Sequence, residues 1–282
     1  MQESAPSRTA MRVAMRRAAH QLLDSPLVLA DPLAVPIIGP EAVARIDATR
    51  HKQRRLTARA ARAFMAVRSR FAEDELARAV GRGVAQYVVL GAGLDTFAYR
   101  SPFPGLRVFE VDHPATQAWK RRKLARAHID PPPSMTFVPV DFERETAGAR
   151  LSASGFDPEA PAFFAWLGVT MYLTGEAIAS TLRFIAATPA TGGLALDYLA
   201  PVSLTDWRTR IALWWLSRKV AAAGEPFRTL FSPAALHDQL TRLGFTSIVD
   251  LGRSELNARY FAGRSDRLRI SGTAGRVLSA EL

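Results

Sequence analysis

Residues 86–96 read QYVVLGAGLDT, an apolar run that passes directly into a glycine turn. The run is short, rich in valine and bounded by glycine, which is typical of a buried strand. Gly91 permits a tight turn, and Gly93 lets a ligand approach the backbone closely. A dinucleotide fingerprint has a third glycine where this chain has Thr96, which argues against NAD. The turn therefore favours another nucleotide-like ligand, although on its own it also fits an ordinary strand-to-helix turn.

Strand-like runs alternate with helical ones beyond this turn. We expect strands at 86–90, 107–111, 136–140, 162–167, 194–198 and 246–251. Helical spacing follows at 114–127, 175–187 and 232–243, with Thr174 and Ser232 as side-chain N-caps of the last two. Residues 267–278 supply a last strand, which we expect to be antiparallel and to close the edge of the sheet. This alternation predicts an α/β fold, a doubly wound sheet with helices on both faces.

Two further helical regions flank the predicted sheet. Residues 7–80 have helical spacing broken by four prolines, and we expect residues 1–80 to form an N-terminal helical cap before a domain at 81–282. Three tryptophans, at 207, 214 and 215, lie in arginine-flanked helical sequence, so we expect an inserted helical lid at about 200–230.

Composition excludes several classes of protein. The chain has no cysteine, which excludes disulfides, thiolate metal sites and a cysteine nucleophile, and we expect no metal. No window approaches the roughly 18 consecutive apolar residues that span a bilayer. Arginines interrupt the first 19 residues, unlike a secretory signal. These features predict a soluble, cytoplasmic protein with no membrane partner.

The net charge of +11 raises the question of a nucleic-acid partner. No acidic residue interrupts residues 50–70, and a second basic cluster occupies residues 120–126. We interpret both as solvated helix faces, because no aromatic residues alternate with them in the way that base stacking requires. We therefore expect no nucleic-acid partner.

Acidic residues follow the next two predicted strands. Asp112 ends the second strand, where an acid accepts hydrogen bonds from ribose hydroxyls in doubly wound folds. Glu110 lies two positions earlier and is the alternative for that role, or it pairs with an arginine. Asp141 and Phe142 follow the third strand, where they suit the amine and ring of adenine, unless Asp141 caps a helix. Three successive strand ends thus point to one nucleotide site.

Four motifs together resemble the leucine carboxyl methyltransferase family. They are VLGAGLDT at 89–96, FEVDHPAT at 109–116, FVPVDF at 137–142 and LGVTMYL at 167–173. The similarity runs from about residue 7 to about residue 272, and it is strongest to a bacterial branch that includes polyketide O-methyltransferases. The resemblance implies a seven-stranded class I methyltransferase sheet with its last strand antiparallel, an N-terminal helical cap, and S-adenosylmethionine as the methyl donor.

The family's donor site can be transferred to matching positions of this sequence. The resemblance implies that the donor-binding residues are Arg68, Gly91, Ala92, Gly93, Asp112, Asp141 and Phe142. The glycine turn would line the methionine part of the donor, and Asp112 the ribose. Arg68, in VRSRF at 67–71, matches a family arginine of the cap that faces a carboxylate. An arginine suits this role because its planar guanidinium binds carboxylates bidentately.

Two positions near the fourth predicted strand leave open how the donor is contacted and whether a side chain acts as an acid or base. Many relatives have glutamate where this chain has Leu167, so a polar contact to the donor is missing or replaced. Tyr172 is a candidate for orienting the substrate or acting as an acid or base, although an aromatic residue at a helix start more often belongs to the core.

Methyl transfer from a sulfonium donor depends mainly on positioning, so a strong acid/base dyad is not required. We predict O-methylation of a carboxylate or phenolic hydroxyl on a small molecule. One alternative is a nucleic-acid methyltransferase, although residues 168–172, GVTMY, lack the Asn-Pro-Pro-aromatic element of base N-methylation. The other is a non-catalytic protein that binds the donor, which Leu167 suggests.

Overall fold

The computed structural model describes residues 7–142, 144–188, 192–222 and 224–282. A seven-stranded sheet of order β3-β2-β1-β4-β5-β7-β6 organises this part of the chain. Its strands are β1 Gln86–Leu90, β2 Arg107–Asp112, β3 Met135–Pro139, β4 Ala162–Trp166, β5 Gly193–Leu199, β6 Thr246–Leu251 and β7 Gly275–Glu281. The first five strands pair in parallel, and β7 runs antiparallel to both of its neighbours. The predicted fold class is confirmed.

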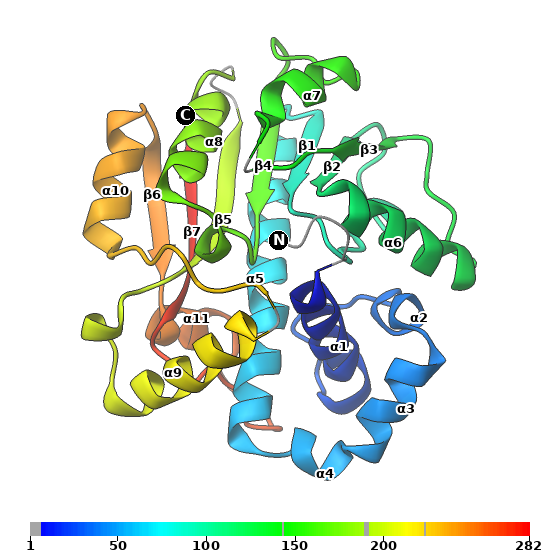
Figure 1. The fold of residues 1–282 in the computed structure, drawn as a ribbon, viewed down its shortest axis with the longest axis vertical. Helices are drawn as coiled ribbons and strands as arrows, with labels where there is room; N and C mark the ends of the chain where they lie inside the picture. Colours follow the sequence, from blue (N-terminus) through cyan, green and yellow to red (C-terminus); the bar gives the residue numbers. More distant parts are fainter. Residues whose placement is uncertain (1–6, 143, 189–191, 223) are drawn as a thin grey trace.

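Helices cover both faces and the lower edge of this sheet (Figure 1). The α-helices are α1 Arg8–Leu23, α2 Ala34–Ile38, α3 Pro40–Ala48, α4 Arg50–Gln53, α5 Leu56–Gly81, α6 Pro114–Arg126, α7 Ala147–Ala153, α8 Gly175–Ala186, α9 Trp207–Ala221, α10 Pro233–Arg242 and α11 Arg253–Tyr260. Short 3-10 helices are η1 Phe97–Tyr99, η2 Thr170–Tyr172 and η3 Val202–Leu204. The predicted N-caps are confirmed, since Thr174 and Ser232 accept from the backbone of Ala177 and Ala235.

Alternate residues of each central strand point to opposite cores. In β1, Tyr87 and Val89 pack in the cluster that includes α5, whereas Val88 and Leu90 pack in the one that includes α7, α8 and α10. Both faces of the strand are therefore buried, which explains why its sequence is a continuous apolar run instead of an alternating pattern.

The last strand differs from the prediction in its position and its start. We expected it at the edge, whereas β7 lies between β5 and β6, and β6 is the edge strand. The strand begins at Gly275 instead of residue 267. Before it, the side chain of Asn257 donates to the Ile270 carbonyl and accepts from the Ile270 N–H, both at 2.9 Å. The Asn257 side chain thus satisfies the backbone N–H and carbonyl of Ile270, which would otherwise need a neighbouring strand as their partner.

The N-terminal helices lie below the carboxyl ends of the parallel strands (Figure 1). Helices α1, α2 and α3 share a small core that also includes Leu124 of α6, while α5 packs against the sheet. Among the residues described, no helix has the length and apolar character needed to cross a membrane.

Candidate functional site

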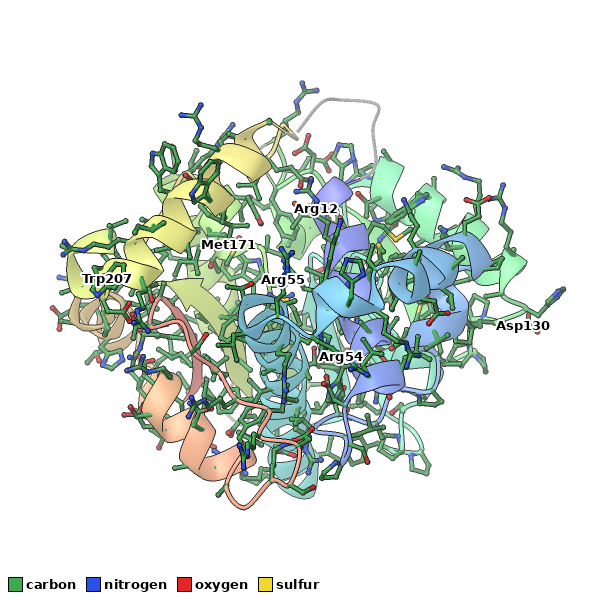
Figure 2. The ribbon with its side chains drawn as sticks, turned by 90° about the horizontal axis from the view of Figure 1, so that it is seen from below. Arg12, Arg54, Arg55, Asp130, Met171 and Trp207 are labelled. Atoms are coloured by element: carbon green, nitrogen blue, oxygen red, sulfur yellow. The ribbon has the colours of Figure 1, made fainter. Side chains whose placement is uncertain are left out.

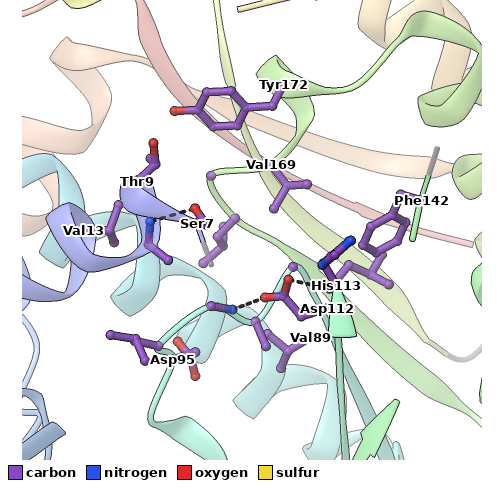
Figure 3. A pocket seen from close by; sticks show the side chains of 18 of the residues that line it. Ser7, Thr9, Val13, Val89, Asp95, Asp112, His113, Phe142, Val169 and Tyr172 are labelled. Carbon is purple, nitrogen blue, oxygen red and sulfur yellow. Dashed lines mark hydrogen bonds between the residues drawn. The ribbon is translucent and has the colours of Figure 1, made fainter. Parts of the chain in front are cut away.

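A pocket of about 390 Å³ lies where β1, β2, β3 and β4 end. Its walls come from the start of α1, the glycine turn, the segments after β2, β3 and β4, and residues 224–228 beyond α9. All of the residues predicted to bind the donor line it, and so does Tyr172. Figure 3 labels Asp112, Phe142 and Tyr172 among the lining residues. The structure thus brings together side chains that the sequence places on separate strands, at the position where open α/β sheets bind ligands.

The glycine turn is shaped by positive backbone angles and close contacts. The φ angles of Gly91 and Gly93 are +68° and +50°, in the left-handed region that favours glycine. A Cβ atom at Gly91 would lie 2.2 Å from Cγ2 of Val169, so the turn and the segment after β4 leave no room for a side chain. Thr96, which replaces the third glycine of a dinucleotide site, accepts a hydrogen bond from Arg17 and donates one to Asp31. Its hydroxyl joins the turn to the N-terminal helices.

Asp112 holds the turn from the end of β2. One carboxylate oxygen accepts from the Gly93 N–H at 2.5 Å and the other from the His113 N–H at 2.6 Å (Figure 3). Burial raises the pKa of Asp112, and these two N–H donors partly offset the effect. Each oxygen keeps a second lone pair for a ligand hydroxyl. His113 caps α6 by accepting from Ala115, as expected of a turn residue.

Glu110, the alternative for Asp112, lies outside the pocket. It is fully buried and accepts from the Lys120 ammonium at 2.6 Å and from the Tyr99 hydroxyl at 3.4 Å. Burial raises the pKa of Glu110 to about 7, and Lys120 opposes this shift. The prediction that the 120–126 cluster is a solvated face is wrong for Lys120, which is 1% exposed, because Glu110 is its buried partner.

Asp141 and Phe142 lie beside Asp112, at the end of the adjacent strand. The Val140 N–H donates to the Asp112 carbonyl at 2.9 Å, which joins the two strand ends. The Asp141 carboxylate lies 4.0 Å from Nε2 of His113 and 3.8 Å from Nε of Arg144. Asp141 is not the N-cap of α7, the next helix of the described chain, because α7 begins six residues later behind Thr146. Both residues face the pocket that Asp112 lines.

Arg68 of α5 forms a buried ion pair that the sequence did not reveal. Its Nη1 donates to Oδ2 of Asp197 in β5 at 2.8 Å, and Asp197 also accepts from the Gly168 N–H. The pair therefore joins α5, β5 and the segment after β4 around the pocket. The signal in the sequence was an acid inside the apolar strand LALDYL at 194–199, since a buried charge requires a partner.

The basic run at 50–70 does not form one free surface. Arg62 and Arg68 are 3% and 6% exposed, and they pair with Asp24 and Asp197. The prediction of a solvated helix face is thus wrong for these two arginines, because their acidic partners lie far away in the sequence. This observation also weakens the case for a nucleic-acid partner.

Tyr172 and Leu167 lie on the wall formed after β4. The Tyr172 ring stacks against Phe227 with centroids 5.6 Å apart. Burial raises the pKa of Tyr172, so the phenol stays protonated at neutral pH and is unsuited to act as a general base. Leu167 places an apolar side chain on the pocket wall.

Two contacts to α1 were not predicted from the sequence. Glu225, beyond α9, accepts from the backbone N–H of Thr9 at 3.1 Å and from its hydroxyl. Arg17 is buried and contacts the carbonyl of Leu94, the hydroxyl of Thr96 and the carboxylate of Asp31. Helix α1 is therefore held at its start by Glu225 and further along by the glycine turn and Asp31.

Comparisons with known proteins agree with this geometry. The family model described as leucine carboxyl methyltransferase matches residues 10–186. The chain is 34% identical over 204 residues to "Putative S-adenosyl-L-methionine-dependent methyltransferase YktD" of Bacillus subtilis, which covers 71% of this chain and 67% of that protein. It is 39% identical over 168 residues to a protein of the same description from Parafrankia sp., covering 58% of this chain and 51% of that protein. The chain thus spans about two thirds of one relative and about half of the other.

Solved structures share the fold at low sequence identity. A "putative methyltransferase" from Thermobifida fusca superposes with a TM-score of 0.60 at 16% identity, covering 99% of this chain and 96% of that chain. A DUF574 family protein from Streptomyces avermitilis gives 0.58 at 16% identity, covering 95% and 96%. The family match extends over more than half of the chain and agrees with the motifs. This protein therefore belongs to the leucine carboxyl methyltransferase family, whose members use S-adenosylmethionine.

Proposed function

We propose that this protein transfers a methyl group from S-adenosylmethionine to an oxygen of a small acceptor, a carboxylate or a phenolic hydroxyl. The observation that supports this most strongly is the meeting of three strand-end motifs in one pocket. The glycine turn, Asp112 and the Asp141–Phe142 pair lie on successive strands, yet all of them line the same cavity. Its volume of about 390 Å³ is within the usual range for small-molecule sites.

The residues present fit the donor. In this proposal Asp112 accepts from the ribose hydroxyls, Asp141 and Phe142 contact the adenine, and residues 91–93 line the methionine part. The bare backbone at Gly91 and Gly93 supports the fit, because both glycines line the pocket and neither has a side chain that would keep a ligand from the backbone. We propose that Arg68 faces the donor's carboxylate, although in the structure its Nη1 is engaged by Asp197.

The sulfonium of the donor supplies an activated methyl group, so the protein's task is to place an acceptor oxygen in line with it. A carboxylate is already ionised at neutral pH and needs no general base. The protonated Tyr172 can donate a hydrogen bond and orient the acceptor. We propose that the helical cap of residues 1–80 and the lid at about 200–230 select the acceptor, since Thr9 and Glu225 meet at the pocket.

Calorimetry with S-adenosylmethionine, S-adenosylhomocysteine and NAD tests the ligand class. We expect both adenosyl ligands to bind one site and NAD not to bind, because Thr96 is tied to Asp31 and Arg17 where a dinucleotide site needs glycine. Preferential binding of NAD would refute the proposal.

Turnover tests the activity. With a panel of carboxylates and phenols, we expect S-adenosylhomocysteine to form together with a methyl ester or methyl ether. Tight donor binding without turnover would instead support the non-catalytic alternative suggested by Leu167. Filter binding of DNA and RNA across salt concentrations tests the alternative of a nucleic-acid methyltransferase. Tight binding that weakens steeply with salt would indicate a partner bound through its phosphates.

A further inference from the structure

The outer side of helix α9 is apolar. Four large apolar residues of this helix are 52–65% exposed: Trp207, Ile211, Trp214 and Trp215. The spacing of Trp207, Ile211 and Trp214, four and then three residues, places them in one stripe along the helix. Leu213 and Val220, on the other side of α9, are buried. A surface helix normally presents polar residues to water, so a helix that is apolar on its outer side as well indicates a contact surface.

The 3-10 helix η3 extends this stripe. Its residues Val202 and Leu204 are 43% and 58% exposed. Arg210 of α9 donates to the Val202 carbonyl at 3.1 Å, which joins the two helices. Figure 2 shows α9, drawn in yellow, along the outer edge of the molecule, with Trp207 at the periphery. We call the exposed apolar residues of η3 and α9 the α9 surface; its members are residues 202, 204, 207, 211, 214 and 215.

Positive charge accompanies the α9 surface. Arg208 and Arg218 are exposed, and their guanidinium groups lie 5.2 and 5.0 Å from the ring centroids of Trp207 and Trp214. The sequence of α9 contains no aspartate or glutamate. Within the parts of the chain that the structure describes, neither arginine has an acidic partner. The charge of this surface therefore complements an anionic partner.

Three kinds of partner could cover an apolar and basic surface. A second copy of the chain is disfavoured, because pairing α9 with itself would bring the arginines of both copies together. Nucleic acid would use the tryptophans and the arginines, but it gives no role to the aliphatic residues Val202, Leu204 and Ile211. A lipid surface uses all of them: tryptophans lie among the headgroups, aliphatic side chains enter the acyl boundary, and arginines attract anionic lipids.

We propose that the α9 surface binds the protein to the face of a bilayer that contains anionic lipids. This proposal departs from the expectation of no membrane partner, which considered only spanning segments, because a helix that lies in the interface does not span the bilayer. Residues 224–226 follow α9 and line the pocket. Binding through α9 therefore brings one wall of the pocket close to the lipid.

Vesicle sedimentation tests the proposal. We expect the wild type to bind vesicles of phosphatidylglycerol and phosphatidylcholine in equal amounts, and to bind vesicles of phosphatidylcholine alone much more weakly, because the arginines need anionic headgroups. In Trp207→Gln and Trp214→Gln the affinity for the anionic vesicles should fall about tenfold, since each variant loses one large apolar side chain from the interface. Arg218→Gln should lower it about fivefold.

Two exposed residues outside the α9 surface provide matched controls. Leu56→Gln removes an apolar side chain at the start of α5, and Arg45→Gln removes a charge from α3, which lies away from α9 in Figure 1. Both controls should bind the anionic vesicles like the wild type. All of the variants should keep the wild-type melting temperature, because each changes an exposed side chain.

Several results would overturn the proposal. One is equal binding to the two kinds of vesicle, and another is unchanged binding in both tryptophan variants. A dimer in analytical ultracentrifugation that dissociates in Trp214→Gln would show that a second copy covers α9 instead. Tighter binding of an oligonucleotide than of vesicles, weakened in the same variants, would assign the surface to nucleic acid. Failure to bind S-adenosylhomocysteine would count against the proposed function alone, since vesicle binding is measured without that ligand.

Discussion

Two glycines shape the pocket because they have no side chain. Gly91 and Gly168 have positive φ angles, and each faces a side chain of another segment: Val169 for Gly91, and Arg68 for Gly168. Conformation and close packing therefore both require glycine at these positions. An acidic residue fixes the same turn, since the Asp112 carboxylate accepts hydrogen bonds from the N–H groups of Gly93 and His113.

Gly91→Ala tests the requirement for a bare turn. We expect the free energy of unfolding to fall by about 1–2 kcal/mol, the cost of a left-handed alanine. Affinity for S-adenosylhomocysteine should fall as well, because Val169 must move when a Cβ atom is placed 2.2 Å from its Cγ2. Gly83→Ala is the control, since Gly83 has a φ of +101° but no atom lies within 4 Å of the position that a Cβ would take there. It should lose less stability than Gly91→Ala, because no neighbour has to move, and it should keep its affinity, as measured by urea unfolding and calorimetry.

Asp112→Asn tests the acid at the end of β2. Because an amide is a weaker acceptor than a carboxylate and one of its two groups is a donor, we expect affinity for S-adenosylhomocysteine to fall about tenfold or more. Calorimetry gives the dissociation constant, and Asp130→Asn at an exposed position controls for the change in net charge. An unchanged affinity would exclude Asp112 from the donor site.

At the scale of elements, buried ion pairs hold the parts of the site together. Arg68–Asp197 joins α5 to β5, and Lys120–Glu110 joins α6 to β2. Removing one member of such a pair leaves the other charge buried and unpaired, which costs far more than breaking an exposed pair.

Arg68→Ala tests the first of these pairs. We expect the free energy of unfolding to fall by about 3–5 kcal/mol, since Asp197 would remain buried without its partner. Arg70→Ala, two residues further along α5, breaks a pair with Asp74 in which the arginine is 49% exposed, and it should cost less than about 1 kcal/mol. Urea unfolding measures both variants, and equal losses would contradict this account.

Glu110 makes stability depend on pH. Its pKa is about 7 in the folded protein, above its ordinary value of 4.5. The folded state therefore binds the proton more tightly, so the stability that this group contributes is complete below about pH 4.5 and is lost as the pH rises through 7. In Glu110→Gln, the decrease in unfolding free energy between pH 5 and pH 7 should become smaller. Urea unfolding at pH 5, 6 and 7 gives the two slopes, and equal slopes would contradict the assignment.

At the scale of the whole molecule, the two cores on either side of the sheet make the strands interdependent. Leu278 of β7 is fully buried in the core that also contains residues of β1, β4 and β5. We expect Leu278→Ala to lower the free energy of unfolding by about 2–5 kcal/mol. Leu56→Ala, at a position that is 79% exposed, should change it by less than about 0.5 kcal/mol. A single unfolding transition in both variants would show that the sheet unfolds as one unit.

Local sequence patterns predicted most of the helices and strands. Contacts between residues far apart in the sequence were not predicted. The strands β1 and β6 match their predicted bounds, and each ends directly before a glycine, Gly91 or Gly252, which marks the end of a strand locally. Predicted donor-site residues meet in the pocket because parallel strands bring their carboxyl ends together. The partners of the buried arginines were not predicted, since Arg62 and Arg68 pair with acids 38 and 129 positions away. No local pattern contains such contacts, and charge alone suggested a solvated surface.

The position of β7 also bears on how the protein is made. Because β6 pairs only with β7 in the described sheet, a nascent chain that has reached residue 251 has no partner to offer that strand. The outer side of β5 stays open for the same reason. An unpaired strand edge is prone to intermolecular pairing, so the ribosome-bound intermediate is the species most exposed to aggregation. When residues 275–281 leave the exit tunnel, β7 covers the open side of β5 and one side of β6 in one step, and the outer side of β6 remains the edge of the described sheet.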